Sequence, residues 1–227
     1  MLKFEVAGFQ FKDHQLRKQK FHISTPINLT YQFNDDAPYS IQGSSGFESE
    51  WAAGHLLRTG KIAAASDIQS IGRKETGVMI EGTLSSPPPI VLPPIKLTAY
   101  ELLNLTASFQ EKSILYKDTG TAHTGAYANS KALIVAMNDI YRMNVLDKIC
   151  GSIVLKGPHS PILLTSGKIC DITVSVAHHL GVQVIISRSA PLWNACQLAE
   201  KTGQTLVGFA RGPKFSIFGK NHHIVIN

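Results

Sequence analysis

The sequence predicts an α/β protein whose first part is a smaller, mixed α+β unit. From Ala132 onward, short apolar runs typical of strands alternate with segments of helical periodicity, which is the pattern of an α/β sheet. Before this pattern lies a proline-rich segment, residues 85–95, which cannot hold a regular helix and lacks amide donors for a central strand. We therefore expect two domains: residues 1–95, mixed α+β and ending in a Pro-rich loop, and residues 96–227, the α/β domain.

The first domain is expected to contain short strands around one helix. Ser45 and Glu48 have the spacing of a capping box, which predicts a helix over residues 47–58 that Gly60 ends. Alternating, β-prone residues predict strands in this domain, at residues 21–24, 28–33, 62–65 and 77–81.

The second domain is expected to open with a capped helix and to continue as a regular alternation. Thr98 and Glu101 repeat the capping-box spacing and predict a helix that extends to about Phe109. Strands are then expected at residues 132–137, 162–165, 182–187, 205–209 and 215–218, and helices at residues 144–154, 170–180 and 191–202. This alternation predicts a largely parallel sheet with right-handed crossovers.

Short polar motifs directly follow four of the predicted strands. They occupy residues 138–144, 166–168, 188–191 and 210–214. Loops after parallel strands gather at one edge of the sheet, where ligands of α/β proteins bind. Arginines, lysines, hydroxyls and glycines at that edge predict a pocket for a phosphorylated or otherwise anionic ligand. Arg211 is the leading candidate because its guanidinium can hold a phosphate with two hydrogen bonds, and Gly212 allows the backbone to approach closely.

Composition indicates a globular protein with a preference for anionic partners. The chain has 227 residues, of which 44% are apolar and 17% charged, and its net charge is +6. No basic stripe with interleaved aromatic residues is present, so nucleic acid is not the expected partner. No apolar run reaches the roughly 18 residues that span a bilayer, and the first residues lack a signal-peptide layout. We therefore expect a cytoplasmic protein without membrane contact.

Cysteine and histidine spacing argues against a metal site. Cys150, Cys170 and Cys196 are far apart, and no C-x-x-C pair is present, so neither a disulfide framework nor a structural zinc site is expected. The P-loop, the dinucleotide-binding glycine motif and the nucleophile elbow are also absent from the sequence.

Six short motifs follow one another in the order that characterises a known family. They are EWAAGHLLRTGKI (residues 50–62), TGTAHTGA (119–126), DIYRMNVLDKICG (139–151), SGK (166–168), SAP (189–191) and TLVGFARG (205–212). These resemble the ELAxGFLxxEGII, TGGxHxA, EDVGRHNALDKVIG, SGR, SAPT and TLxGFxRG signatures of the formate dehydrogenase accessory protein family, FdhD/NarQ. The resemblance covers roughly residues 20–220.

The resemblance implies a cytidine-deaminase-like α/β sheet with helices on both faces, and a homodimer. It implies binding of bis-molybdopterin guanine dinucleotide, the molybdenum cofactor, or of a GDP-like nucleotide. The implied partners are the formate dehydrogenase apoenzyme, which is the client, and a cysteine desulfurase, which supplies sulfur to a sulfurtransferase activity. The candidate cofactor-binding residues are Phe209, Ala210, Arg211, Gly212, Pro213, Lys214, His123, Asp139, Arg142, Asn144, Ser166, Gly167 and Ser189.

The chain departs from the family where sulfur transfer is concerned. Family members carry a C-x-x-C pair at the position that corresponds to residues 85–95, which here contain prolines and no cysteine. Persulfide transfer needs a thiolate, so the usual relay cannot use this loop. Cys170 is the candidate substitute, because a helix N-terminus and Lys168 would both favour its thiolate. The alternative is that Cys170 is a small packing residue. Asn138, Tyr141, Met143 and Ile172 also differ from the family pattern.

Two functions therefore stay open. One is a maturation factor that still transfers sulfur, through Cys170 or a cysteine of a partner. The other is a non-enzymatic cofactor chaperone, or a repurposed paralogue, without sulfurtransferase activity. A zinc deaminase is excluded because His123 is not followed by the glutamate of the H-x-E motif and no cysteine pair is present.

Several residues have equally ordinary explanations. His123 either contacts ligand or packs in its loop, and Asp139 with Arg142 either binds ligand or caps a turn. Asp147 and Lys148 either belong to the site or form an ion pair on a helix surface.

Overall fold

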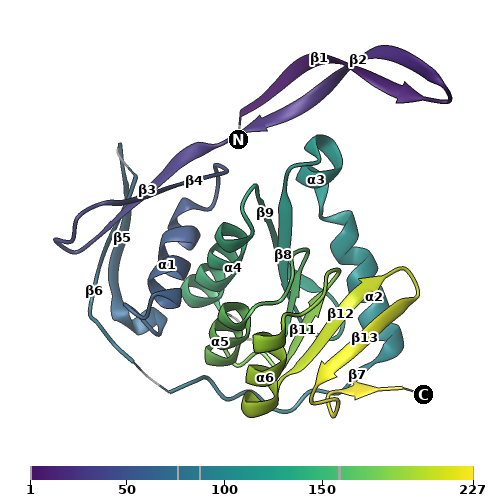
Figure 1. The fold of residues 1–227 in the computed structure, drawn as a ribbon. Helices are drawn as coiled ribbons and strands as arrows, with labels where there is room; N and C mark the ends of the chain where they lie inside the picture. The colour runs from purple at the N-terminus through teal and green to yellow at the C-terminus, as the bar shows by residue number, and fades with distance from the viewer. Residues whose placement is uncertain (1, 76, 87, 158–159, 227) are drawn as a thin grey trace.

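The computed structural model describes residues 2–75, 77–86, 88–157 and 160–226. Its largest element is a six-stranded sheet in the order β13-β12-β11-β10-β8-β9 (Figure 1). The strands are β8 (His123–Ala128), β9 (Leu133–Asp139), β10 (Ile162–Thr165), β11 (Val184–Ser187), β12 (Thr205–Arg211) and β13 (Lys214–Gly219). Helices are α2 (Ala99–Glu111), α3 (Ile114–Thr119), α4 (Arg142–Lys156), α5 (Asp171–His179) and α6 (Trp193–Thr202).

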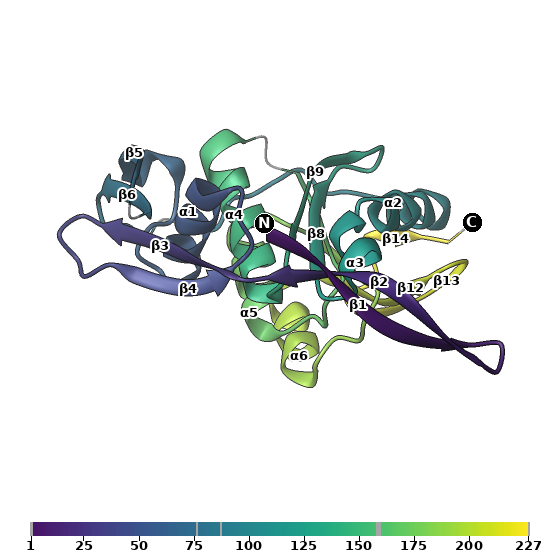
Figure 2. The same cartoon turned by 90° about the horizontal axis from the view of Figure 1, so that it is seen from above.

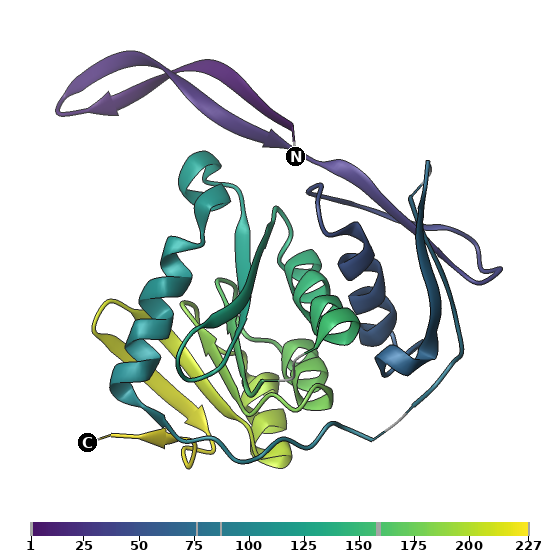
Figure 3. The same ribbon diagram turned by 180° about the vertical axis from the view of Figure 1, so that it is seen from behind.

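Helices cover both faces of this sheet, which confirms the predicted α/β class and is compatible with a cytidine-deaminase-like arrangement. Alternate residues of each strand enter different cores, as the period of two requires. Leu163 and Ile185 pack in the core with α4, α5 and α6, whereas Leu164 and Ile186 pack in the core with α2. Figure 3 shows α2 crossing the face opposite to α4 and α5.

The sheet is mixed, so the prediction of a largely parallel sheet is wrong. Pairs β10–β11 and β11–β12 are parallel, whereas β8 is antiparallel to both β9 and β10, and β13 is antiparallel to β12. β8 was not predicted because its sequence, HTGAYA, is poor in β-branched residues. Its burial between two strands compensates for that weak propensity. The two short strands β7 (Leu97–Thr98) and β14 (Ile224–Val225) form a separate parallel pair.

A four-stranded sheet, in the order β4-β3-β6-β5, and helix α1 (Glu48–Arg58) form the first half. The strands are β3 (Ile27–Phe33), β4 (Tyr39–Gly43), β5 (Ile68–Lys74) and β6 (Gly77–Gly82). Helix α1 lies directly against α4, and one hydrophobic cluster contains buried residues of both halves, including Trp51 and Ile149. The predicted division at residue 95 falls in the extended segment between β6 and β7.

Two local predictions in the first half are wrong. Ser45 does not cap α1, which begins at Glu48 after Phe47 in the left-handed region (φ 63°), without a side-chain cap. The predicted strand at residues 62–65 is absent. A short 3-10 helix (Ala65–Asp67) begins there, because Asp67 Oδ2 accepts hydrogen bonds from the backbone of Ala63 and Ala64 and turns the chain. By contrast, the predicted capping box of Thr98 and Glu101 is confirmed, with both reciprocal hydrogen bonds present.

Residues 2–25 form a long antiparallel hairpin, β1 (Leu2–Lys12) and β2 (Gln15–Thr25), that projects from the body. We call this hairpin the arm. Figure 2, seen from above, shows it running across α3 toward the side of β12 and β13. No strand or helix was predicted before residue 21. Among the described residues, no helix is both long and apolar enough to cross a bilayer.

Candidate functional site

Four strand ends and one strand start meet at the upper edge of the central sheet in Figure 1. β9 to β12 all end at this edge, because β9 and β10 both run antiparallel to β8 and the next two strands are parallel to β10. β8 begins here, since His123 pairs with Asp139 and Gly125 with Thr165. The polar motifs after the strands therefore converge, as the sequence predicted.

A cavity of about 230 Å³ lies at this edge. It is lined by Ser113, Tyr116, Ala122, His123, Thr124, Ser166, Arg188 and Arg211. None of these lining residues is acidic, and two of them are arginines. The cavity is therefore electropositive and suited to an anion.

The polar wall of the cavity is held by the junction of β8 and β10. The Thr124 amide donates to Ser166 Oγ at 3.0 Å, and the Ser166 amide donates to the Thr124 carbonyl at 2.9 Å. Ser166 Oγ also lies 3.4 Å from His123 Nδ1. These hydrogen bonds fix the positions of the serine hydroxyl and the imidazole, so this wall of the cavity is preorganised.

The second wall depends on an irregularity near the end of β12. The register between β12 and β13 shifts between Gly208 and Arg211, and Phe209 has a positive φ of 54°. After this bulge, Arg211 Nε donates to the Arg188 carbonyl at 2.8 Å. That bond anchors the guanidinium through Nε alone, so Nη1 and Nη2 are not used for this carbonyl. Bulges commonly redirect a side chain next to a functional site.

His123 is the titratable group of the cavity. Burial lowers the pKa of His123 and the positive charge of Arg142 lowers it further, while Asp139 acts in the opposite direction. The imidazole is therefore neutral near pH 7 and can accept or donate a hydrogen bond. An anion in the cavity would favour its protonated form.

A model of the FdhD/NarQ family matches residues 79–225. The chain belongs to this family. The sulfur carrier protein FdhD of Bacillus pumilus (strain SAFR-032) is 37% identical over 131 residues, which are 57% of this chain and 49% of that protein. The protein of the same name from Bacillus subtilis (strain 168) is 33% identical over 126 residues, 55% of this chain and 48% of the relative. The matched part of the chain thus spans about half the length of these curated relatives.

A solved structure shares the whole fold. It comes from Desulfotalea psychrophila and is provisionally described as a formate dehydrogenase accessory protein. It superposes with a TM-score of 0.87 and covers 99% of this chain and 100% of its own, at 22% sequence identity. This likeness extends the FdhD/NarQ fold to the first half of the chain, which the family model does not match.

Among the residues predicted from the FdhD/NarQ motifs, His123, Ser166 and Arg211 line the cavity. Ser189 and Gly167 do not line the cavity but stabilise the loop that carries Ser166. Ser189 Oγ donates a hydrogen bond to the Ser166 carbonyl, and Ser187 Oγ donates one to the Gly167 carbonyl. Arg142 is exposed at the start of α4, and its charge acts on His123.

Asp139 and Asn144 are buried beneath the cavity, where their hydrogen bonds and the ion pair of Asp139 stabilise the fold. Asp139 is fully buried, forms an ion pair with Lys148 at 2.8 Å and accepts hydrogen bonds from Ser44, Tyr141 and Asn144. The amide from Tyr141 is the local turn cap that the sequence offered as an alternative for Asp139. Of the two alternatives for Asp147 and Lys148, the ion pair on a helix surface does not form, because both residues are buried and each has a different partner.

The motif at residues 209–214 divides between several environments. Ala210 is fully buried in the core with α2, whereas Gly212 and Pro213 in the turn and Lys214 at the start of β13 are exposed. Phe209 lines a separate apolar groove of about 580 Å³ beside α6, together with Pro191, Trp193 and Phe218.

Cys170 does not line the electropositive cavity. It precedes α5 and lies in a small neighbouring space of about 20 Å³, which Arg142 and Lys168 also line. Its Sγ is 3.4 Å from Thr173 Oγ1. Burial raises the pKa of the Cys150 thiol, with Asp147 adding to the effect, and burial also raises the pKa of Cys196.

The proline-rich segment, where the family resemblance placed the missing cysteine pair, runs along the opposite edge of the sheet. The Ile90 amide donates to the His179 carbonyl, and Gln183, just before β11 begins, bonds the backbone at Leu92 and Ile95. The cavity lies at the other end of β11. Residues 90–95 of this segment therefore do not border the electropositive cavity.

Arg188 belongs to the polar motif at residues 188–191, which the strand-end rule places at this edge, but the family motifs did not add it to the cofactor-binding residues. Tyr116 and Ser113 were not predicted. Tyr116 and Ser113 come from the region of α3, which no strand-end rule connects to this edge.

Proposed function

We propose that this FdhD/NarQ protein is an accessory factor for formate dehydrogenase maturation that binds the guanine-dinucleotide form of the molybdenum cofactor, or a GDP-like nucleotide. The observation that carries the proposal is the electropositive cavity at one sheet edge, in which Arg188 and Arg211 meet His123 and Ser166 without any carboxylate. Paired guanidinium groups, hydroxyls and backbone amides are the groups that recognise phosphate in proteins.

The volume of the cavity supports binding of the phosphate groups in the cavity and of the base in the neighbouring apolar groove. At about 230 Å³, the cavity suits phosphate groups better than a whole nucleotide, since ligand pockets usually measure about 300–1,000 Å³. The apolar groove begins at Phe209, two residues before Arg211, and carries Trp193 with 74% of its surface exposed. An exposed aromatic side chain can stack on a base, at about 1–3 kcal/mol per base in nucleic-acid complexes. In this proposal Arg211 and Arg188 bind the diphosphate, and Trp193 stacks on the guanine.

The residues present fit the phosphate and guanine parts of the cofactor. When bound, the cofactor would supply the molybdenum atom that the client enzyme needs. The chain's own contribution is binding and orientation: the cavity neutralises the diphosphate, and Ser166 and His123 provide directed hydrogen bonds.

Isothermal titration with GDP tests this function. Wild-type protein should bind GDP saturably, and Arg211→Ala should weaken binding at least tenfold, because a charge-assisted bidentate contact contributes about 1.5–3 kcal/mol. Lys201→Ala, which removes an exposed cation from α6, is the matched control and should bind as the wild type does. Absence of GDP binding in the wild type would refute the proposal.

Titration with pyrophosphate, which lacks the base, distinguishes the phosphate-binding part of the site from the base-stacking part. Trp193→Ala should weaken GDP binding and leave pyrophosphate binding unchanged, whereas Arg211→Ala should weaken both. If Trp193→Ala leaves GDP binding unchanged, the base does not stack on this residue.

A second candidate function is sulfur carriage on Cys170. The observation that favours it is that this cysteine lines the same small space as Lys168 and Arg142, two cations suited to an anionic sulfur group carried on the cysteine. After treatment with a cysteine desulfurase and cysteine, the wild type should then carry cyanide-labile sulfur, and Cys170→Ser should not. Cys196→Ser is the control. A wild type free of labile sulfur, beside a positive family control, would leave cofactor binding as the sole function.

A further inference from the structure

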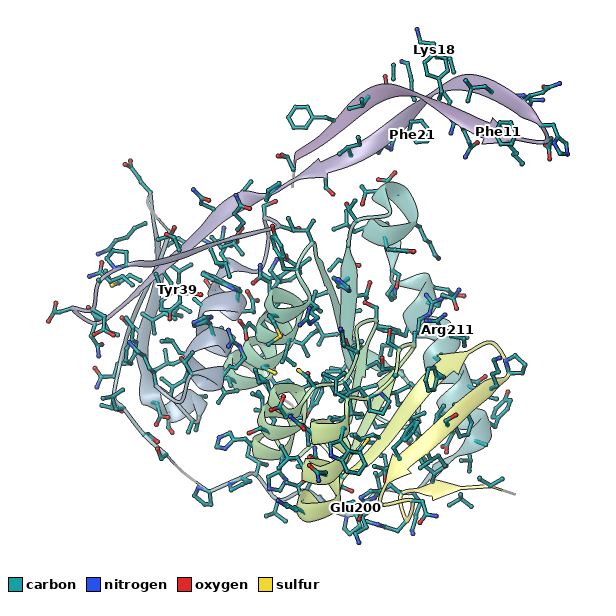
Figure 4. The ribbon with its side chains drawn as sticks, in the orientation of Figure 1. Phe11, Lys18, Phe21, Tyr39, Glu200 and Arg211 are labelled. Atoms are coloured by element: carbon teal, nitrogen blue, oxygen red, sulfur yellow. The ribbon has the colours of Figure 1, made fainter. Side chains whose placement is uncertain are left out.

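The short helix α3 lies between the arm and the electropositive cavity. On one side it contributes Tyr116 to the cavity lining, next to Ser113 from the residue before the helix. On the other side α3 contacts β2 of the arm, and Figure 1 shows the helix directly below the arm at the upper edge of the sheet. In the view of Figure 4, Arg211 lies on the arm's side of the body and Glu200 at the opposite end. Helix α3 is therefore the element through which the arm can act on the cavity.

Two side-chain contacts join the base of the arm to α3 and to the residues that follow it. His22 Nδ1 lies 2.7 Å from Asp118 Oδ1, and Ser24 Oγ lies 2.5 Å from Thr121 Oγ1. His22 and Ser24 are two residues apart on β2, so their side chains point to the same face of the strand. That face of the arm rests on the region of α3.

Helix α3 has little else to fix its position. It has six residues, and a helix of this length is not stable on its own in water. Leu115 is its only buried residue, while Ile114 and Tyr116 are 64% and 52% exposed. Just before the helix, Asn138 Nδ2 donates to the Lys112 carbonyl at 3.3 Å. The contacts with the arm are therefore a large part of what holds α3 in place.

The arm itself is held in a fixed direction by the first half of the molecule. β2 ends at Thr25 and β3 begins at Ile27, so Pro26 alone connects them. Because proline fixes φ near −65°, this joint has little freedom, and β3 is bonded between β4 and β6. Residues 4–20 are exposed except for Gly8 and Gln19, which are half-buried. The arm thus bridges from the first-half sheet to α3, with most of its length in solvent.

Tyr116 is suited to bind an anion in the cavity. It lines the same cavity as Arg188 and Arg211. Within the described part of the chain, its hydroxyl makes no hydrogen bond to another residue. A phenol hydroxyl can donate a hydrogen bond to a phosphate oxygen, and tyrosine is among the residues that contact phosphate in this way. Tyr116 would therefore add a neutral donor to the two guanidinium groups.

We infer that the arm positions this wall of the cavity: His22 and Ser24 hold α3 where the Tyr116 hydroxyl donates to a bound phosphate. Tyr116 is then a ligand-binding residue, and His22 and Ser24 are positioning residues that act through it. The inference rests on the proposed function, because it takes the cavity to be the phosphate site. It extends that function by making ligand affinity depend on the arm, which touches no ligand itself.

Isothermal titration of the full chain with pyrophosphate tests the inference. Tyr116→Phe removes only the hydroxyl and should weaken binding about tenfold, as expected for a hydrogen bond to a charged group. His22→Ala should weaken binding roughly two- to fivefold, because a partly exposed pair contributes less. Gln10→Ala, exposed in the half of the arm nearer to its tip, is the matched control and should bind as the wild type does.

A double variant distinguishes positioning from a general structural role. If the arm acts through the Tyr116 hydroxyl, His22→Ala should have little further effect in the Tyr116→Phe background, whereas independent effects would multiply. His22→Asn, whose side-chain amide can take the place of imidazole Nδ1, should restore the affinity of the wild type. Far-UV circular dichroism and the thermal midpoint show that each variant is folded.

The outcomes separate this inference from the proposed function. Wild-type affinity in Tyr116→Phe, or the same loss from His22→Ala in both backgrounds, would overturn the inference. In either case a loss of pyrophosphate binding in Arg211→Ala would leave the proposed function in place. A wild type that does not bind pyrophosphate would refute the phosphate site and, with it, the role of the arm.

Discussion

Lys148 and Asp139 form an ion pair whose side chains are both fully buried below the candidate site. Removing one partner of such a pair leaves an uncompensated charge, which costs about 3–5 kcal/mol. We therefore expect Lys148→Met to lower the free energy of unfolding by that amount in urea denaturation. The same substitution at Lys156, on the same helix, removes an ion pair with Glu50 whose lysine side chain is 58% exposed, and should cost less than about 1 kcal/mol. Similar losses for the two variants would contradict this account of the buried pair.

His123 should make ligand binding depend on pH. Its pKa in the free protein lies below the usual value of 6.5 because of burial and Arg142, and a bound anion raises it. Binding therefore takes up a proton, so affinity for GDP should rise as pH falls through the range below about 6.5, where the free imidazole begins to protonate. His123→Gln should remove this contribution, and titrations of both proteins from pH 7.5 to about 5.5 isolate it, since the phosphate of GDP titrates equally in both. Parallel pH profiles would show that His123 does not contact the ligand.

Helices α1 and α4 approach so closely that only glycine fits at their crossing. A Cβ on Gly54 would lie 1.8 Å from the Asp147 carbonyl oxygen, and a Cβ on Gly151 would lie 1.7 Å from the Glu50 carbonyl oxygen. Because both obstacles are backbone, the helices must separate to admit a methyl group. Gly54→Ala should therefore lower the free energy of unfolding by more than about 2 kcal/mol, measured in urea. Gly72→Ala is the control, since a Cβ there meets nothing within 4 Å.

Local signals differed in how well they predicted the start of an element. The capping box at Thr98 formed because its residues need only each other and the first turn of α2. The same spacing at Ser45 did not cap α1, since Glu48 Oε1 accepts the Gly46 amide and Glu48 Oε2 pairs with Arg73, 25 residues away. At Glu101 the capping box forms because its carboxylate binds Thr98, whereas the carboxylate of Glu48 is bound to Gly46 and Arg73 instead.

The two halves of the molecule should unfold together. Their shared hydrophobic cluster is reinforced by Arg58, which binds both oxygens of Asp147 at 2.6 and 3.0 Å, and by Lys148, which donates to the Ser44 carbonyl. In a Trp193→Phe variant, the fluorescence of buried Trp51 reports the first half alone. Its urea midpoint should coincide with that of far-UV circular dichroism, which the helices of the second half dominate. Separate midpoints would mean that the first half unfolds independently.

The sequence by itself determined the kind and order of most elements in the second half, and the edge where the site lies. Apolar periodicity and the residues that follow each strand are local, and the strand-end rule was enough to bring Ser166 and Arg211 to one place. The sequence could not determine the direction of β8 or the burial of Asp147 and Lys148. Nor could it determine that Tyr116 lines the cavity or that the arm is exposed. These depend on contacts between residues far apart in the chain, and only the tertiary structure decides which of them gain enough burial to form.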